Sequence, residues 1–164
     1  MKINTLVLWL PSKKNMLNKL LLLFISLSAI SVQAQLPLTK DQQAVQQTVI
    51  KMFDALSDRD SVGLKNYCTP DIQLFEYGQV WNIDTLILKA ITQNQAADFK
   101  RTNTFDFIKT TSDKTMAWVT YRLQSVITRE GKQVISQWLE TVVLTKAKKQ
   151  WKLKHLHSTL IKRS

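Results

Sequence analysis

The second half of this 164-residue chain changes from a helical to an alternating hydrophobic pattern, and this change limits its possible folds most strongly. Short polar turns divide the alternating part into segments that should pair as antiparallel neighbours. The turns are Ser112–Lys114, Glu130–Lys132 and Ala147–Gln150. The sequence therefore predicts four long strands, at about 104–110, 115–129, 132–145 and 150–162.

Helical patterns dominate before this sheet. Thr39 and Gln42 form a capping box at the start of a helix whose apolar stripe runs from Ala44 to Leu56. Asp60 is placed to cap a second, short helix. We expect the first third of the mature chain to be helical up to about residue 67.

A short strand and a third helix separate these helices from the long strands. Residues 72–77 form the strand, which stops at Gly78, and Asn82 caps the helix, which runs through Ile91. The order predicts an α+β fold in which three N-terminal helices pack on a mostly antiparallel sheet of four long strands plus one short strand.

The long strands are apolar on both faces. Tyr121 and Leu123 share one face of their strand, while Trp118 and Val126 share the other. A sheet with one face on helices and the other in water should alternate more cleanly. We therefore expect a second copy of the protein to cover the second face, which gives a homodimer through the sheet.

The first 34 residues have the pattern of an export signal. Met16–Lys19 is a short basic start, residues 20–30 are apolar but too few to span a bilayer, and Ser31–Ala34 supplies small residues for cleavage before Gln35. We expect residues 35–164 to be a single exported domain, periplasmic or extracellular and not membrane-spanning. Because Met16 alone begins a complete signal, translation could start there or at Met1.

Positive charge gathers near the C-terminus. Four lysines leave with the signal and no acid does, so the formal charge falls from +11 to +7. From residue 146 to the end of the chain there is no acidic residue. The basic residues of this segment are Lys146, Lys148, Lys149, Lys152, Lys154, Lys162 and Arg163. Nucleic acid is not an expected partner of an exported protein. The basic end could contact an anionic surface, or its lysines could simply keep an edge strand from pairing with other chains.

Glu76 is the first candidate for chemistry. It lies beside Phe75 and Tyr77 on the short strand, where burial would raise its pKa and make it a general base near neutral pH. The alternative is that it points to solvent, because Phe75 and Glu76 must face opposite sides.

Glu140 is the second candidate. If the turn at Glu130–Lys132 has three residues, Arg122 lies opposite Glu140 and a cross-strand ion pair explains both. The alternative is a catalytic acid or a pocket contact.

The two histidines, His155 and His157, alternate on the last strand and should share one face about 7 Å apart. We take His157 as a catalytic candidate and His155 as a ligand contact, although a one-residue slip in the preceding turn would move both to the other face of the sheet.

A zinc site needs three or four ligands, so neither a metal nor another cofactor is expected. Cys68 is the single cysteine and cannot form an internal disulfide.

Four short segments in a fixed order carry a family resemblance: Ala55–Asp60, Tyr67–Asp71, Trp81 and Trp151–Thr159. Over about residues 41–162 the chain resembles the nuclear transport factor 2-like superfamily, which includes ketosteroid isomerases and SnoaL-like polyketide cyclases. The resemblance implies a cone-shaped fold with a curved sheet, an apolar pocket at the open end, and dimers packed through the sheet.

The resemblance does not settle the activity, because one fold serves many functions. The isomerase base aligns with Glu76, but Met52 stands where the isomerases have an oxyanion-stabilising tyrosine, and a thioether cannot donate a hydrogen bond. Our leading hypothesis is binding of a small, largely apolar ligand. The alternatives are an isomerase, cyclase or hydrolase that uses Glu76 or a histidine as base, and a non-catalytic dimeric interaction module. The expected ligand contacts are Tyr77, Trp81, Tyr121, Trp138, Glu140 and His155.

Overall fold

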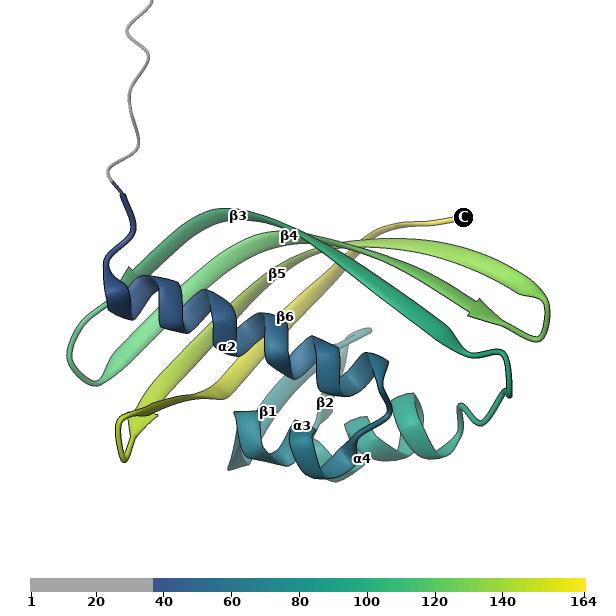
Figure 1. Cartoon of the computed structure of the whole chain (residues 1–164), viewed down its shortest axis with the longest axis horizontal. Helices are drawn as coiled ribbons and strands as arrows, with labels where there is room; N and C mark the ends of the chain where they lie inside the picture. The colour runs from purple at the N-terminus through teal and green to yellow at the C-terminus, as the bar shows by residue number, and fades with distance from the viewer. Residues whose placement is uncertain (1–36) are drawn as a thin grey trace, which may run out of the picture. The chain divides into compact units, whose positions relative to one another are not determined.

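The computed structural model describes residues 37–164, so the expected export signal lies outside the described residues. Its longest helix, α2 (Lys40–Ser57), begins at the expected capping box. Thr39 Oγ1 accepts a hydrogen bond from the Gln42 amide at 3.2 Å, and Gln42 Oε1 accepts one from the Thr39 amide at 2.9 Å. Each bond satisfies a backbone donor that a helix start leaves free. The buried stripe of α2 packs under the concave side of the sheet (Figure 1).

The two other expected helices are also present. Helix α3 (Ser61–Tyr67) is capped by Asp60, whose carboxylate accepts from two backbone amides of the first turn. Helix α4 (Ile83–Ile87) is capped by Asn82 and continues as a π-helical turn, η1 (Leu88–Thr92). The π turn widens the helix where it lies beside the cavity described below.

A single sheet contains all the strands of residues 37–164, and its spatial order is β2-β1-β6-β5-β4-β3. Only the β1–β6 pairing is parallel. The α+β prediction is confirmed, with one strand more than expected because the chain turns at Tyr77 and Gly78 and returns as β2. The strands are β1 (Cys68–Glu76), β2 (Gln79–Trp81), β3 (Lys100–Ser112), β4 (Met116–Arg129), β5 (Lys132–Ala147) and β6 (Gln150–Arg163).

The β4–β5 hairpin has a two-residue turn, not the three-residue turn considered above. Glu130 and Gly131 both have positive φ, 52° and 68°, as a type I′ turn requires. The shorter turn places Tyr121, not Arg122, opposite Glu140. The expected Arg122–Glu140 ion pair is therefore wrong: Arg122 pairs instead with Asp106, at 3.3 Å between Nη1 and Oδ2.

A bulge in β6 decides which way the two histidines point. The pairing with β5 shifts between Leu153 and His155, so Lys154 is the extra residue. Leu153 and Leu156 are consequently both buried on the concave side. His155 and His157 lie on the convex side, where their rings are 5.0 and 6.0 Å from the ring of Phe75.

The two faces of the long strands differ in how far their side chains are buried. On the concave face, Val119, Tyr121 and Val142 are completely buried. On the convex face, Trp118 and Leu139 are each 39% exposed, because the helices cover only the concave side (Figure 1). No helix within residues 37–164 combines the length and apolar character needed to cross a membrane.

Candidate functional site

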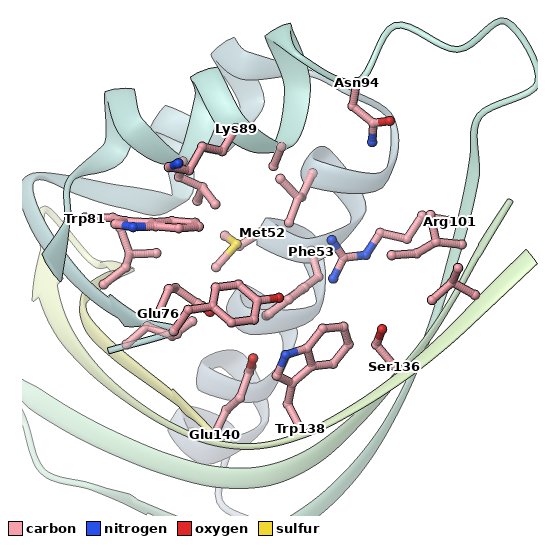
Figure 2. Close-up of a pocket in the computed structure, with 18 of the residues that line it drawn as sticks. Met52, Phe53, Glu76, Trp81, Lys89, Asn94, Arg101, Ser136, Trp138 and Glu140 are labelled. Carbon is pink, nitrogen blue, oxygen red and sulfur yellow. The ribbon is translucent and has the colours of Figure 1, made fainter. Parts of the chain in front are cut away.

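A cavity of about 320 Å³ lies between the concave face of the sheet and the helices (Figure 2). Its volume is roughly that of ten water molecules in the liquid, and it is near the lower end of the range for small-molecule sites. Most of its wall is apolar. The apolar and aromatic lining residues are Met52, Phe53, Leu56, Leu74, Tyr77, Trp81, Leu86, Ala90, Phe99, Ile127, Val134, Trp138 and Leu156.

Strand β5 supplies the floor of the cavity. Ser136, Trp138 and Glu140 alternate along it, so all three side chains point to the same side (Figure 2). All three are buried. Four residues of strand span about 13 Å, so Ser136 and Glu140 mark two ends of the floor with the Trp138 indole between them.

Two carboxyl groups meet at the Glu140 end. The strand order β1-β6-β5 places Glu76 and Glu140 on either side of Ser158, because the parallel register that pairs Phe75 with His157 brings Glu76 level with Ser158. The Ser158 hydroxyl donates to Glu140 Oε1 at 2.9 Å. Within residues 37–164, Glu140 Oε2 and the Tyr121 hydroxyl are buried without a hydrogen bond of ordinary geometry. Tyr121 lies directly opposite Glu140, however, and a hydrogen bond from its hydroxyl acts against the increase that burial causes in the pKa of Glu140.

Burial perturbs both carboxyls. It raises the pKa of Glu76 to about 7, and the charge of Glu140 adds to the increase, while Ser158 and Arg101 act against it. Burial also raises the pKa of Glu140. Two carboxyls that share a poorly hydrated site cannot both ionise easily. At neutral pH the pair therefore holds a proton that it can release or take up.

The opposite end of the cavity is basic. Arg101 reaches in from β3, with its guanidinium 5.5 Å from the centre of the Phe53 ring (Figure 2). Arg163 from β6 donates to Ser136 Oγ at 3.2 Å and to the Tyr77 hydroxyl at 2.7 Å. Arg129 also lines the cavity, as does Lys89, which lies on the other side with its Nζ 5.3 Å from the centre of the Trp81 ring (Figure 2). Four cationic side chains face two carboxyls, so the lining is positive even when both carboxyls are ionised.

The structure brings together five of the residues that the sequence proposed for the site: Glu76, Tyr77, Trp81, Trp138 and Glu140 line the cavity. Tyr121 lies behind this wall, with its ring packed on three phenylalanines of the core. His155 and His157 do not line the cavity, because the β6 bulge turns them to the convex face.

Several cavity residues were missed in the sequence. Arg101 lies outside the predicted strand at 104–110, because β3 starts four residues earlier than predicted. Ser136 could have been found from its alternation with Trp138 and Glu140, which is visible in the sequence. Arg163 and Ser158 carry no comparable local signal.

Neither a metal cluster nor a readily ionised thiol is found in the part of the chain that the structure describes. No group of three or more His, Cys, Asp or Glu side chains in residues 37–164 is placed to hold a metal ion. Cys68 is buried, and burial raises the pKa of its thiol to about 12, which leaves almost no thiolate at neutral pH.

The family of the chain follows from its sequence and its fold together. The SnoaL-like domain family matches residues 45–161, which are most of the chain. The chain therefore belongs to the SnoaL-like family, within the nuclear transport factor 2-like superfamily, and the resemblance noted in the sequence is confirmed. No curated protein sequence matches the chain.

Solved structures with different names share this fold. A ketosteroid isomerase-like protein from Erwinia carotovora atroseptica has a TM-score of 0.62 at 14% identity, over 76% of this chain and 99% of the other. An NTF2-like protein from Cytophaga hutchinsonii has a TM-score of 0.64 at 13% identity, over 75% and 100%. The S. rosetta CaMKII hub has a TM-score of 0.61 at 21% identity, over 76% and 99%. At these identities the likeness establishes the fold alone.

Proposed function

We propose that this protein is an exported domain that binds a small, largely apolar molecule in the cavity between the sheet and its helices. The observation that carries the proposal is the cavity itself, whose walls are mostly apolar and also present the carboxyl groups of Glu76 and Glu140. A bound ligand would bury its apolar surface against the aromatic walls, and the few polar groups of the lining would orient it.

The experiment is native mass spectrometry of the mature chain, residues 35–164, purified from its own exporting cell. We expect an adduct of a few hundred daltons that is lost on denaturation. In Ala90→Phe, the added ring occupies the cavity and the adduct should disappear; in the matched control Ala147→Phe, the ring is added at an exposed position and the adduct should remain. An adduct that survives in Ala90→Phe would place the ligand elsewhere and refute the proposal.

The second candidate is an enzyme on the same scaffold, with Glu76 as general base. The specific observation in its favour is that the pKa of Glu76, raised by burial and by Glu140, is about 7. A base with this pKa is partly ionised at neutral pH and strong enough to remove a proton next to a carbonyl. The Erwinia carotovora atroseptica protein, which is named as ketosteroid isomerase-like, has the same fold.

Proton removal can be measured without knowledge of the substrate. Wild-type protein should speed deuterium exchange from D₂O into 2-tetralone next to its carbonyl, as followed by NMR. Glu76→Gln should lower that rate by about 10²–10⁴-fold, since glutamine cannot accept the proton. Glu130→Gln, in an exposed turn, is the control and should leave it unchanged. No acceleration by wild type, or an equal rate in Glu76→Gln, would argue against this candidate.

We also propose that two copies associate through the convex face. Met116, Trp118 and Leu139 lie exposed on this face, which no helix of residues 37–164 covers. Trp118→Lys should convert a dimer to a monomer in sedimentation-velocity measurements, because a charge buried at the interface would have no partner. Leu88→Lys, at an exposed helical position away from the sheet, should keep the dimer. A monomeric wild type would refute the association.

Export is proposed on the sequence pattern of residues 1–34. The protein recovered from the periplasm or medium should begin at Gln35, and a mass that includes residues 1–34 would contradict this.

The basic C-terminal end is proposed as the part that could contact an anionic surface. Two of its lysines already have acidic partners, since Lys146 pairs with Asp41 at 2.7 Å and Lys154 pairs with Asp71.

A further inference from the structure

The cavity contains two guanidinium groups that converge on one pair of serines. Ser125 and Ser136 lie opposite each other on β4 and β5, and both are completely buried. Arg101 Nη2 donates to Ser125 Oγ at 3.1 Å, and Arg163 Nε donates to Ser136 Oγ at 3.2 Å. Side chains directly opposite on neighbouring strands are about 5 Å apart at Cβ. The two arginines therefore approach the same point of the floor from opposite sides, Arg101 from β3 and Arg163 from β6.

The Arg101 side chain is held in place by its neighbours. Its Nε donates to Asn103 Oδ1 at 3.0 Å, and the Asn103 amide donates in turn to Ser57 Oγ of α2 at 2.9 Å. The Ser125 hydroxyl also donates to Asn103 Oδ1, at 2.6 Å. This network fixes the direction of the guanidinium before any ligand arrives, which lowers the entropy cost of binding.

Neither guanidinium has a counter-charge in contact. Within residues 37–164, no carboxylate oxygen lies within 4.0 Å of Arg101 or Arg163. Their hydrogen bonds go to neutral hydroxyl and amide oxygens and leave further N–H groups of each fork free. Arg163 is exposed and Arg101 is partly buried, with its pKa lowered mainly by burial. An anion between the two guanidinium groups would relieve their mutual repulsion and the cost of the buried charge.

We propose that the ligand is a small organic carboxylic acid, bound with its carboxylate between Arg101 and Arg163 and its apolar body along Trp138 toward Glu140. The inference rests on the ligand-binding function proposed above and names the chemical class of the ligand. Guanidinium groups bind carboxylates in a two-bond, planar geometry, which the free N–H groups here can supply. The roughly 13 Å of floor from Ser136 to Glu140 fits an acid with an aromatic or short aliphatic body.

The far end of the floor gives the ligand its orientation. The carboxyl pair of Glu76 and Glu140 lies there, and a second carboxylate would be repelled from it. A hydroxyl at the distal end of the acid would lie beside this carboxyl pair, to which it can donate a hydrogen bond. The cavity therefore distinguishes the two ends of its ligand by charge.

Calorimetric titration of mature protein with a matched pair of probes tests the inference. The probes are 3-phenylpropionate and 3-phenylpropanamide, which have the same shape and differ in charge, with inorganic phosphate as an anion that lacks an apolar body. We expect the acid to bind at least about tenfold more tightly than the amide or phosphate, because hydrogen bonds to charged groups contribute that much or more.

Variants locate the carboxylate. Arg101→Gln and Arg163→Gln should each weaken the acid about tenfold or more and leave the amide within a few-fold. Arg122→Gln is the matched control, because this arginine lies on the convex face in an exposed pair with Asp106 and should change neither affinity. If Arg101→Gln does not fold, Arg163→Gln at the exposed cavity mouth and the wild-type comparison of acid with amide still decide the question.

The outcomes separate this inference from the proposed function. Equal affinity for acid and amide would overturn the carboxylate inference and leave ligand binding in the cavity intact. Phosphate that binds as tightly as the acid would overturn it as well, since an apolar body would then contribute nothing. Binding of neither probe would also overturn it, while the adduct measurement on Ala90→Phe would still decide the proposed function independently.

Discussion

Replacement of Glu76 by glutamine should make the stability of the protein less dependent on pH. The pKa of this carboxyl rises from 4.5 to about 7 on folding, through burial and the nearby charge of Glu140. The native state therefore keeps the Glu76 proton over a pH range in which the unfolded chain loses it. The contribution of Glu76 to stability is fully present below pH 4.5 and is lost as pH rises through 7.

The size of the effect follows from the same values. Each tenfold change in an equilibrium constant is worth about 1.4 kcal/mol, so ionised Glu76 destabilises the native state by about 3 kcal/mol at pH 8 relative to pH 4.5. Glutamine has nearly the same shape and no charge at any of these pH values. Wild type should lose about 3 kcal/mol relative to Glu76→Gln over this interval.

Urea denaturation of both proteins at pH 4.5, 6 and 8 measures this difference directly. Subtraction of the two profiles removes the pH dependence of every other group that the substitution leaves unchanged. Those groups include Asp98, whose pKa is lowered by hydrogen bonds from the backbone amides of Gly131 and Glu130. Glu130→Gln is the control, since it also replaces a glutamate by glutamine but at an exposed turn away from the cavity. A difference for Glu76→Gln that changes by less than about 0.5 kcal/mol over the interval would refute the reasoning.

Three further predictions concern the fold. Leu153→Ala should cost about 2–5 kcal/mol in urea denaturation because Leu153 is completely buried, whereas Leu88→Ala, 48% exposed, should cost less than about 1 kcal/mol; equal costs would contradict the burial. Thr39→Ala should lower the unfolding free energy by about 1 kcal/mol through loss of the capping box, and an unchanged value would mean that the cap does not contribute. Gly131→Ala should destabilise by about 1 kcal/mol in thermal unfolding, because φ is +68° although nothing lies within 4 Å of the added methyl group; a stabilised variant would contradict the turn geometry.

Local patterns in the sequence were sufficient to predict the three helices, β1 and the four long strands, but not the short strand β2. The capping box at Thr39, the caps at Asp60 and Asn82, and the alternation of the long strands each depend on residues within a few positions of one another. The same patterns identified five residues that line the cavity, because a carboxylate on an apolar strand is rarely buried without a partner and the aromatic side chains lie beside it.

Register and distant pairing could not be predicted in the same way. The Glu130–Gly131 turn has one residue fewer than the turn considered from the sequence, and this difference places Tyr121 instead of Arg122 opposite Glu140. The bulge at Lys154 turns both histidines to the convex face. The proximity of Glu76 to Glu140 depends on the parallel pairing of β1 with β6, which joins parts of the chain about 80 residues apart. Arg101 was missed because its strand begins earlier than its apolar alternation does.

The central claim, that the cavity is the ligand site, can be tested with the four tryptophans of the described residues. Trp81 and Trp138 line the cavity, Trp118 lies on the convex face, and Trp151 is buried in the core. In protein labelled with 5-fluorotryptophan and titrated with 3-phenylpropionate or its amide, we predict that the ¹⁹F resonances of Trp81 and Trp138 shift while those of Trp118 and Trp151 stay. Single Trp→Phe variants assign the four signals. A shift confined to Trp118, with Trp81 and Trp138 unchanged, would contradict the account.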